Sequence, residues 1–405
     1  MINERIRKMD IGLFISSLLL LACGIVLVYS SSFALASVKY GDGYFFLARQ
    51  AVRALVAIAG FMIFINVDYH FWTKHSTIAF VVAVALLIMV LVMPQGQAIK
   101  GARRWITIGF IRFQVSEFAR TVLILMLAHQ LGTMGEAIRE WKQFAILLAK
   151  VLIICSLIIL EPDFSTAMAV GLIALAILFI AGARISHLAG IAALSIPVIA
   201  LVSTSSSYRL QRWAGFMDKA AHRKDIGYQA FQALVGLGNG GLFGQGLGQG
   251  NQKYFYLPEP HTDFAFAILG EEVGFIGLAV VLAIFLFMIF RGFRIAFRAP
   301  DLPGQLVAFG FTLTMAVYVV LHVSVNTGLV PTTGVPLPFL SYGGMNLIFM
   351  MCCMGILLNI SSQCSPTAAK KAKFSENFDR EPSMGKQQKR RWKSSRAAYR
   401  RKGLR

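Results

Sequence analysis

Charged residues are scarce in this sequence of 405 residues. Only 14% of the chain is Asp, Glu, Lys or Arg, whereas 57% is hydrophobic and the mean hydropathy is +0.65. A water-soluble fold cannot bury so large an apolar fraction. The composition therefore excludes that class and predicts an integral membrane protein.

Cysteine supplies neither a disulfide framework nor a metal site. The five cysteines are odd in number, and all except Cys364 lie inside apolar runs. A disulfide scaffold and a thiolate zinc site are both excluded by this pattern. We interpret the cysteines as small apolar residues.

Ten apolar runs have about the 20 residues that a membrane-spanning helix needs. They are 11–31, 49–67, 76–94, 116–132, 143–160, 164–183, 186–206, 265–290, 304–329 and 339–360. We therefore predict an all-α integral membrane protein with about ten transmembrane helices in residues 11–361. One large extracytoplasmic loop, at about 207–264, separates the seventh helix from the eighth, and long ordered loops usually carry function. No internal repeat supports an inverted-repeat transporter.

Basic residues indicate the orientation of these spans. An even number of spans puts both termini on one side, and Arg139, Arg184 and Arg291 fall on that side. The positive-inside rule assigns it to the cytoplasm. Residues 1–10 are accordingly predicted to be a cytoplasmic N-terminus that is not cleaved as a signal peptide.

The C-terminal segment is strongly basic. Residues 364–405 hold fourteen Lys or Arg against three acidic residues, which gives +11 of the total net charge of +20. We predict that 362–405 is a disordered cytoplasmic tail held near anionic lipid head groups. A nucleic-acid-binding arm is the alternative.

Two outer loops contradict the positive-inside rule. Residues 95–115 contain four Lys or Arg and no acid, and 207–264 adds six Lys or Arg against four acidic residues. Cations placed outside indicate an anionic ligand, and arginine matches diphosphate oxygens well. The alternative is a solvated loop paired with lipid phosphates.

Ionisable residues at the ends of spans are candidates for function because charge is costly in lipid. Glu117 and Arg120 lie three apart on one helical face, so a local ion pair is the alternative for both. Lys150 is interpreted as a side chain that snorkels or pairs with a carboxylate. Asp163 either lines the outer cavity or caps the following helix, as an aspartate three residues before Thr166 can do.

The large loop contains GLGNGGLFGQGLGQG at 236–250 and ends in HTDF at 261–264. Although the glycines match G-x-G-x-x-G, no βαβ unit surrounds them, so a dinucleotide site is excluded. They would permit a close backbone approach to anionic oxygens, or simply make the loop flexible. Asp263 would stand at the membrane surface, where desolvation makes a carboxylate a stronger base, or it would cap the next helix. The segment 335–344, with two prolines and paired glycines, is interpreted as a packing element at the cavity floor.

Six ordered motifs resemble those of the SEDS family of bacterial membrane glycosyltransferases. They are RRWI at 103–106, QVSEFAR at 114–120, EPDFST at 161–166, GLGNGGLFGQGLG at 236–248, YLPEPHTDFAFAILGEE at 256–272 and VPLPFLSYGG at 335–344. The resemblance covers about residues 10–361 and is closer to the division branch of the family than to the elongation branch. The departures are Val115, Arg120, Met345 and Asn346, where Pro, Lys and small serines are usual, and they concern the fine geometry of the cavity.

The resemblance implies a peptidoglycan glycosyltransferase that polymerises lipid II at the outer face of the cytoplasmic membrane during septal wall synthesis. The essential aspartate of the family matches Asp263, and the residues that line its central cavity match Glu117, Arg120 and Asp163. The other candidates for substrate binding are Arg103, Arg104, Arg212, His261 and Ser341. The resemblance implies as partners a class B penicillin-binding protein (a transpeptidase), other divisome proteins and membrane lipids, with no nucleic acid.

The chemistry also follows from the residue types. A sugar that reacts outside the cell must arrive already activated, and a lipid diphosphate is a good leaving group. One base, Asp263, would then suffice, with inversion at the anomeric carbon and arginines that stabilise the departing diphosphate. The motifs specify no cofactor, since no ligand cluster is present. They leave open a divalent cation, Mg²⁺ or Mn²⁺, between carboxylate and diphosphate. A lipid II flippase and a noncatalytic divisome scaffold are the alternative functions.

Overall fold

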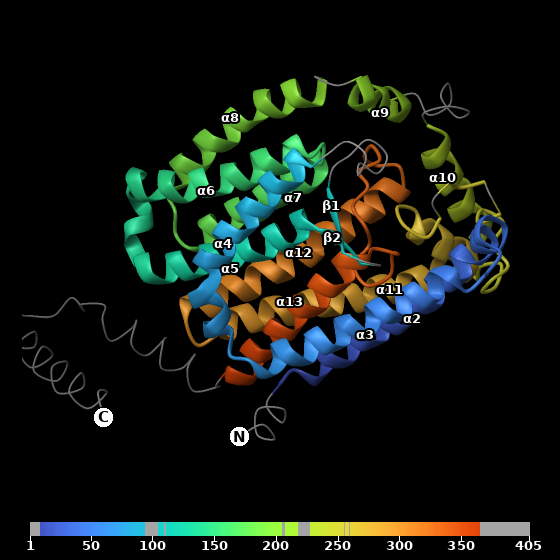
Figure 1. Ribbon diagram of the computed structural model, residues 1–405, viewed down its shortest axis with the longest axis horizontal. Coiled ribbons are helices and arrows are strands. Elements are labelled where there is room, and N and C mark those ends of the chain that lie inside the picture. The colour runs from blue at the N-terminus through green and yellow to red at the C-terminus, as the bar shows by residue number, and fades with distance from the viewer. Residues whose placement is uncertain are drawn as a thin grey trace, which may run out of the picture. The chain divides into compact units, whose positions relative to one another are not determined.

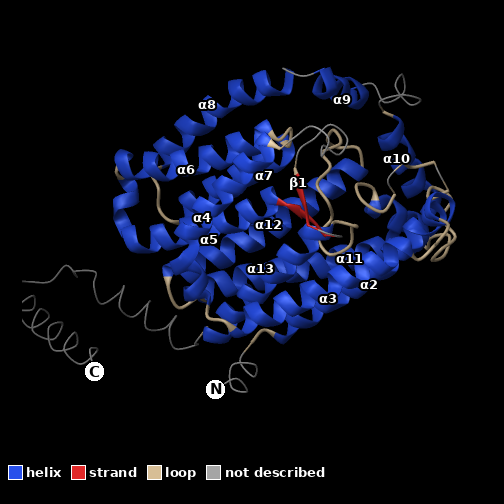
Figure 2. Cartoon of the chain, viewed as in Figure 1, coloured by secondary structure: helices blue, strands red, loops and turns tan. Residues whose placement is uncertain are grey.

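The described part of the protein is mainly α-helical and contains one short hairpin. The computed structural model describes residues 9–93, 104–108, 111–204, 207–217, 227–254, 256–258 and 260–364. Residues 1–8, Arg103 and the tail from 365 onwards, for which predictions were made above, lie outside this part. Figures 1 and 2 show long helices packed side by side and two strands between them.

Each predicted span coincides with one long helix. In chain order these are α2 (Ile11–Tyr40), α3 (Phe45–Asn66), α4 (Tyr69–Val92), α5 (Val115–Met134), α6 (Trp141–Leu160), α7 (Phe164–Ile180), α8 (Ile185–Thr204), α11 (Ala265–Arg298), α12 (Leu302–Asn326) and α13 (Gly344–Gln363). A short 3₁₀ helix, η2 (Gly135–Arg139), joins α5 to α6. The protein is thus an all-α integral membrane protein, as the composition predicted.

The count of ten spans is not fixed by these helices. In the described part, eight helices are long and apolar enough to cross a membrane, while Phe164–Ile180 and Ile185–Leu201 are apolar but shorter. A helix of 17 residues, such as α7, is about 25 Å long, at the lower limit for a span. Figure 1 places α8 at the edge of the helical array, beside α7.

The structure corrects three predicted boundaries. The loop predicted at 95–115 contains a hairpin, in which β1 (Trp105–Ile108) pairs antiparallel with β2 (Ile111–Gln114). The large outer loop is not simply a loop, because it contains α9 (Ser207–Met217) and α10 (Tyr228–Gly240). The last helix begins at Gly344 rather than at 339, because Phe339 adopts a φ of 64° and the two prolines before it cannot continue a helix.

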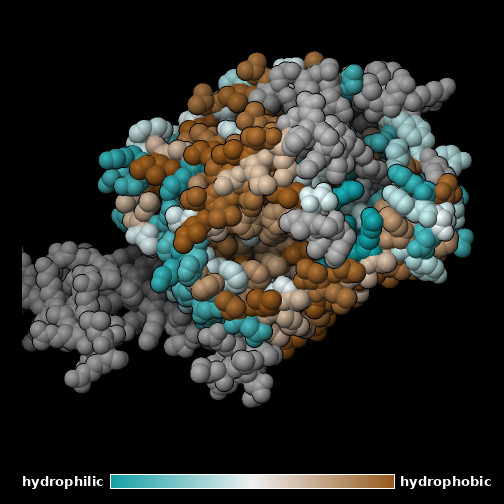
Figure 3. Space-filling model, viewed as in Figure 1, coloured by the Kyte–Doolittle hydropathy of each residue, from teal (hydrophilic) through white to brown (hydrophobic). Residues whose placement is uncertain are grey.

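The core lies around α13, in which every residue from Met350 to Ile360 is buried. This helix packs along α3 and also contacts α2, α5 and α12. Small residues allow close approach, since a Cβ at Gly24 of α2 would collide with the carbonyl oxygen of Phe339. Hydrophobic side chains cover much of the surface in Figure 3, whereas hydrophilic ones gather at two ends, which is the pattern of a protein that faces lipid.

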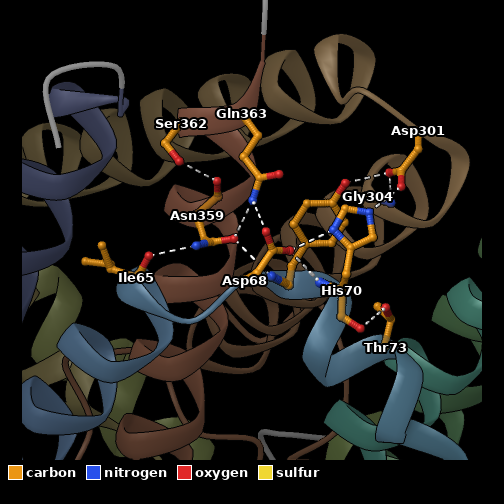
Figure 4. Close-up of polar contacts among 10 residues, drawn as sticks. Ile65, Asp68, His70, Thr73, Asp301, Gly304, Asn359, Ser362 and Gln363 are labelled. Atoms are coloured by element: carbon orange, nitrogen blue, oxygen red, sulfur yellow. Dashed lines mark hydrogen bonds and ion pairs between the residues drawn. The ribbon is translucent and has the colours of Figure 1, made fainter. Parts of the chain in front are cut away.

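A polar cluster closes the end of the bundle that is predicted to be cytoplasmic (Figure 4). Asp68 and Asp301 cap α4 and α12 by accepting from backbone amides. The ring of His70 lies between the two carboxylates, with Nδ1 2.7 Å from Asp68 and Nε2 2.8 Å from Asp301. Carboxylate oxygens only accept, so the ring donates to both only when it is doubly protonated. Asn359 of α13 joins the cluster by accepting from Tyr69 N at 3.0 Å and donating to Ile65 O at 2.8 Å.

Candidate functional site

The predicted outer loops converge at the opposite end of the helices. Tyr342 N donates to His261 O at 2.7 Å, which joins the segment before α13 to the segment before α11. Arg212 of α9 donates to Thr332 O at 2.8 Å. Segments that are more than 80 residues apart in sequence are therefore held together by one backbone bond and one bond from an arginine side chain.

Asp263 lies in the turn that precedes α11 and is half-buried. The helix is capped by Phe264 without a side-chain hydrogen bond, so the capping alternative for Asp263 is not what the structure shows. Its backbone carbonyl accepts from Asn326 Nδ2 of α12 at 3.2 Å. On the facing segment, a Cβ placed on Gly334 would lie 4.0 Å from Asp263 Oδ2, so a backbone without a side chain borders the carboxylate.

Glu117 and Arg120 form an ion pair on α5. Arg120 Nη2 lies 2.7 Å from Glu117 Oε2, and the two side chains are only 1% and 2% exposed. The guanidinium stacks 4.6 Å from the ring centroid of Tyr318 on α12, whose hydroxyl donates to Glu117 Oε1 at 3.3 Å. The local ion-pair alternative is confirmed. The pair is buried between α5 and α12.

Arg104 joins the hairpin to the turn between α6 and α7. Its Nε donates to Glu161 O at 3.0 Å, its Nη2 donates to Pro162 O, and its Nη1 lies 3.7 Å from Asp163 Oδ2. Asp163 also accepts from Thr166 N at 3.4 Å, which confirms it as the N-cap of α7. With these contacts the side chain of Arg104 is one quarter exposed at the end of the bundle that is predicted to face outward.

Glu161 is fully buried in the same turn. Neither of its carboxyl oxygens makes a hydrogen bond within the described residues. The pKa of this carboxyl is raised to about 8, mainly by burial and also by the nearby Asp163, while Arg104 partly opposes the rise. Near neutral pH the group therefore carries a proton for much of the time.

The glycine-rich segment is clamped to α11 by backbone hydrogen bonds. Gln245 N donates to Glu271 O and Gly246 N to Glu272 O, both at 2.9 Å, near a kink at Gly274 with φ of 68°. These two amides are therefore not available to a ligand.

The two glutamates at the head of α11 anchor the same loop. Glu271 accepts from the amides of Asn251 and Gln252 at 3.1 and 3.0 Å. Glu272 accepts from Lys253 Nζ at 2.8 Å and from Ser30 Oγ on α2 at 2.5 Å. Both carboxylates are thus positioning groups for the loop that leads to Asp263.

The remaining predicted site residues contact the loops and helix ends around them. The ring of His261 packs 4.6 Å from Phe46 and 5.2 Å from Tyr342, measured between centroids. Ser341 Oγ accepts from Leu337 N at 2.9 Å and so holds the turn before α13. Arg212 borders a surface hollow whose other walls include Gly328 and Pro331. The described residues contain no group of three His, Cys, Asp or Glu that could hold a metal ion.

Sequence reasoning missed three polar residues of α12. Tyr318 contacts the Glu117–Arg120 pair. His322 bonds to the segment that faces Asp263, and Asn326 bonds to the backbone of Asp263 itself. Their spacing of four residues places them on one helical face within an apolar run, a signal that the search for charged residues ignored.

The chain is similar to known proteins over most of its length. The family described as cell cycle protein, FTSW_RODA_SPOVE, matches residues 11–365. A probable peptidoglycan glycosyltransferase FtsW of Geobacter sp. (strain M18) is 37% identical over 89% of this chain and 98% of that protein. Stage V sporulation protein E of Bacillus subtilis (strain 168) is 39% identical over 87% of this chain and 96% of its own length.

Solved structures agree with these relatives. A chain from a peptidoglycan synthase complex that coordinates polymerization and crosslinking has a TM-score of 0.73 and 25% identity, and the match covers 88% of this chain and 99% of that one. The rod shape determining protein RodA of Thermus thermophilus has a TM-score of 0.66 and 25% identity, over 88% of this chain and 97% of its own. The chain therefore belongs to the family of FtsW, RodA and SpoVE, the SEDS family that its motifs resemble.

Proposed function

We propose that this chain is a peptidoglycan glycosyltransferase that polymerises lipid II at the outer face of the cytoplasmic membrane. The observation that carries the proposal is the placement of Asp263. Its main chain is held by α12, and its carboxylate faces the bare backbone at Gly334, at the end of the bundle where Arg104 and Arg212 also lie. A base in this position can meet a sugar hydroxyl that approaches from the membrane surface.

In the proposed reaction Asp263 is the general base. Its carboxylate takes the proton from the 4-hydroxyl of the acceptor sugar while that oxygen attacks the anomeric carbon of the donor. The bond from the anomeric carbon to the diphosphate oxygen breaks, and its electron pair leaves with the lipid diphosphate. Because the new bond forms on the face opposite the broken one, an α-linked donor gives a β-linked chain. Glycosidases need a second carboxyl as acid for a poor leaving group, and a diphosphate does not.

The arginines supply charge for the leaving group. Arg104 is held by two backbone carbonyls, and Arg212 by one, so each guanidinium is oriented before substrate arrives. Preorganised cations stabilise developing negative charge without a cost of reorganisation. We propose Arg103, which precedes this cluster in the chain, His261 and Ser341 as further substrate-binding residues, and a divalent cation remains compatible with the diphosphate.

We propose that Glu117, Arg120 and Asp163 support the substrate-binding surface from beneath it. The buried pair on α5 keeps Tyr318 in place, and Asp163 orients Arg104. We further propose that both termini are cytoplasmic, that the protein works at the division septum, and that its partner is a class B penicillin-binding protein. The relative found in a peptidoglycan synthase complex supports the choice of partner.

The test is polymerisation of lipid II by the purified protein, with and without the transpeptidase, for wild type and Asp263→Asn. Asp42→Asn is the matched control, because Asp42 is an exposed aspartate of another outer loop that accepts from Tyr44 N at 2.9 Å. We expect glycan strands from wild type and from Asp42→Asn, and none from Asp263→Asn. Equal polymer from all three would remove Asp263 from the mechanism. No polymer from folded wild type with its partner would favour the flippase or the scaffold.

A further inference from the structure

One buried amide on α12 holds the backbone of Asp263. Asn326 is fully buried, and both the nitrogen and the oxygen of its side-chain amide make hydrogen bonds. Nδ2 donates to Asp263 O at 3.2 Å and to His322 O at 2.9 Å, while Oδ1 accepts from Ala267 N at 3.1 Å. Asn326 therefore grips the chain on both sides of the point where α11 begins.

The same helical face holds the segment opposite Asp263. His322 lies one turn before Asn326, is 1% exposed, and places Nδ1 2.9 Å from Val335 O. A carbonyl only accepts, so the proton of this ring is on Nδ1. Val335 adjoins Gly334, the residue that borders the Asp263 carboxylate. Two side chains of α12 thus fix the two backbone segments between which the carboxylate lies.

We propose that Asn326 is a positioning residue for Asp263 and that His322 does the same for the facing segment. The proposal rests on the function of Asp263 as the general base. A base must lie within hydrogen-bond reach of the proton that it takes, and a displacement of about 1 Å lowers the rate by about 100-fold. Removing the hydrogen bonds of Asn326 should therefore lower kcat. KM should stay nearly unchanged, because the arginines keep their contacts with the substrate.

The chain contains a matched control at its other end. Asn359 is also fully buried, accepts from the amide of Tyr69 at a helix start, and donates to the backbone carbonyl of Ile65. It belongs to the cluster around Asp301, and Asp301 and Asn326 stand at opposite ends of α12, which at 25 residues is about 37 Å long. Asn359→Ala removes the same kind of bonds far from Asp263.

Two substitutions of Asn326 separate positioning from helix capping. Asn326→Ala removes the donor and the acceptor. Asn326→Asp keeps an acceptor for Ala267 N but cannot donate to Asp263 O while it is ionised. A residue that only caps α11 would tolerate the aspartate well, because aspartate is a good cap. A residue that positions Asp263 would not.

The experiment measures initial rates of lipid II polymerisation, with the partner present, over a series of lipid II concentrations. Each rate is divided by the amount of folded protein in the sample. For Asn326→Ala and Asn326→Asp we expect kcat to fall about tenfold to 100-fold, with KM within about twofold of wild type. Asn359→Ala should keep the wild-type kcat. His322→Asn, which retains a donor at the place of Nδ1, should be more active than His322→Leu.

Three results would overturn the inference while the proposed function stands. They are a wild-type kcat for Asn326→Ala, an Asn326→Asp variant as active as wild type, and equal losses for the variants of Asn326 and Asn359. A rise in KM alone would show that Asn326 acts on substrate binding and would also contradict it. No polymer from folded wild type would instead reject the proposed function and the inference together.

Discussion

Replacing Lys253 by methionine tests whether the glycine-rich loop is clamped to α11. Lys253 Nζ lies 2.8 Å from Glu272 Oε1, and the two side chains are 5% and 0% exposed. Methionine fills much of the volume of the lysine stem, so the change removes the charge with little cavity. What remains is a buried carboxylate that is bound by Ser30 alone among its described side-chain partners.

The expected cost follows from that isolated charge. Removing one partner of a buried ion pair destabilises a protein by about 3–5 kcal/mol, because the other charge stays buried without compensation. Replacing both partners by neutral groups is often close to neutral. We therefore expect Lys253→Met to lower the free energy of unfolding by about 3–5 kcal/mol. The double variant with Glu272→Gln should be more stable than Lys253→Met alone, because Gln can still bond to Ser30 Oγ.

The assay is a double-mutant cycle on the purified protein in mixed micelles. Unfolding is followed by loss of helical signal, and the loop at 241–254 is probed in parallel by limited proteolysis. Lys253→Met should unfold at lower denaturant and expose the loop to cleavage. A change of less than about 1 kcal/mol, or a double variant as unstable as the sum of the two single ones, would refute the clamp.

Two further perturbations test other parts of the outer end. Gly244 and Gly248 have φ of 81° and 82°, but a Cβ on Gly244 would collide with Glu272 O, whereas the space at Gly248 is open. Gly244→Ala should therefore lower the midpoint of thermal unfolding well below that of Gly248→Ala, and equal midpoints would contradict the packing. For Glu161, whose pKa is raised from 4.5 to about 8, the stabilising protonated form is fully present below pH 4.5 and is lost as the pH rises through about 8. Glu161→Gln should flatten this loss in unfolding curves at pH 5, 7 and 9, and an unchanged pH dependence would exclude Glu161 as its source.

Much of the fold was predictable because hydrophobic length dominates in a membrane protein. All ten apolar runs coincide with helices, and the capping alternative for Asp163, which its spacing to Thr166 indicated, is confirmed. The hairpin at 105–114 and the helices inside the large loop were missed. These elements are shorter than a membrane span, so a search for apolar runs of about 20 residues does not find them.

The candidate site was predictable only where its contacts are local. Glu117 and Arg120 are three residues apart, and this spacing already indicated their pairing as the alternative to a functional role. Asn326 is 63 residues from Asp263, and an uncharged amide in an apolar run gives no indication of which backbone it will meet. The bonds between the glycine-rich segment and α11 were not predictable for the same reason, because the amides of Gln245 and Gly246 meet carbonyls about 25 residues later in the chain.

The arginines that break the positive-inside rule have a structural use before any catalytic one. Arg104 binds the carbonyls of Glu161 and Pro162, at the C-terminal end of α6, where the helix dipole favours a cation. These contacts occupy two of its five donors, and the nearby Asp163 faces a third nitrogen. In the proposed reaction, an arginine fixed in this way would lose little conformational entropy when a diphosphate arrives. The cost of placing this cation on the outer side would then be offset twice, by the helix end that it caps and by the proposed anion that it is already oriented to meet.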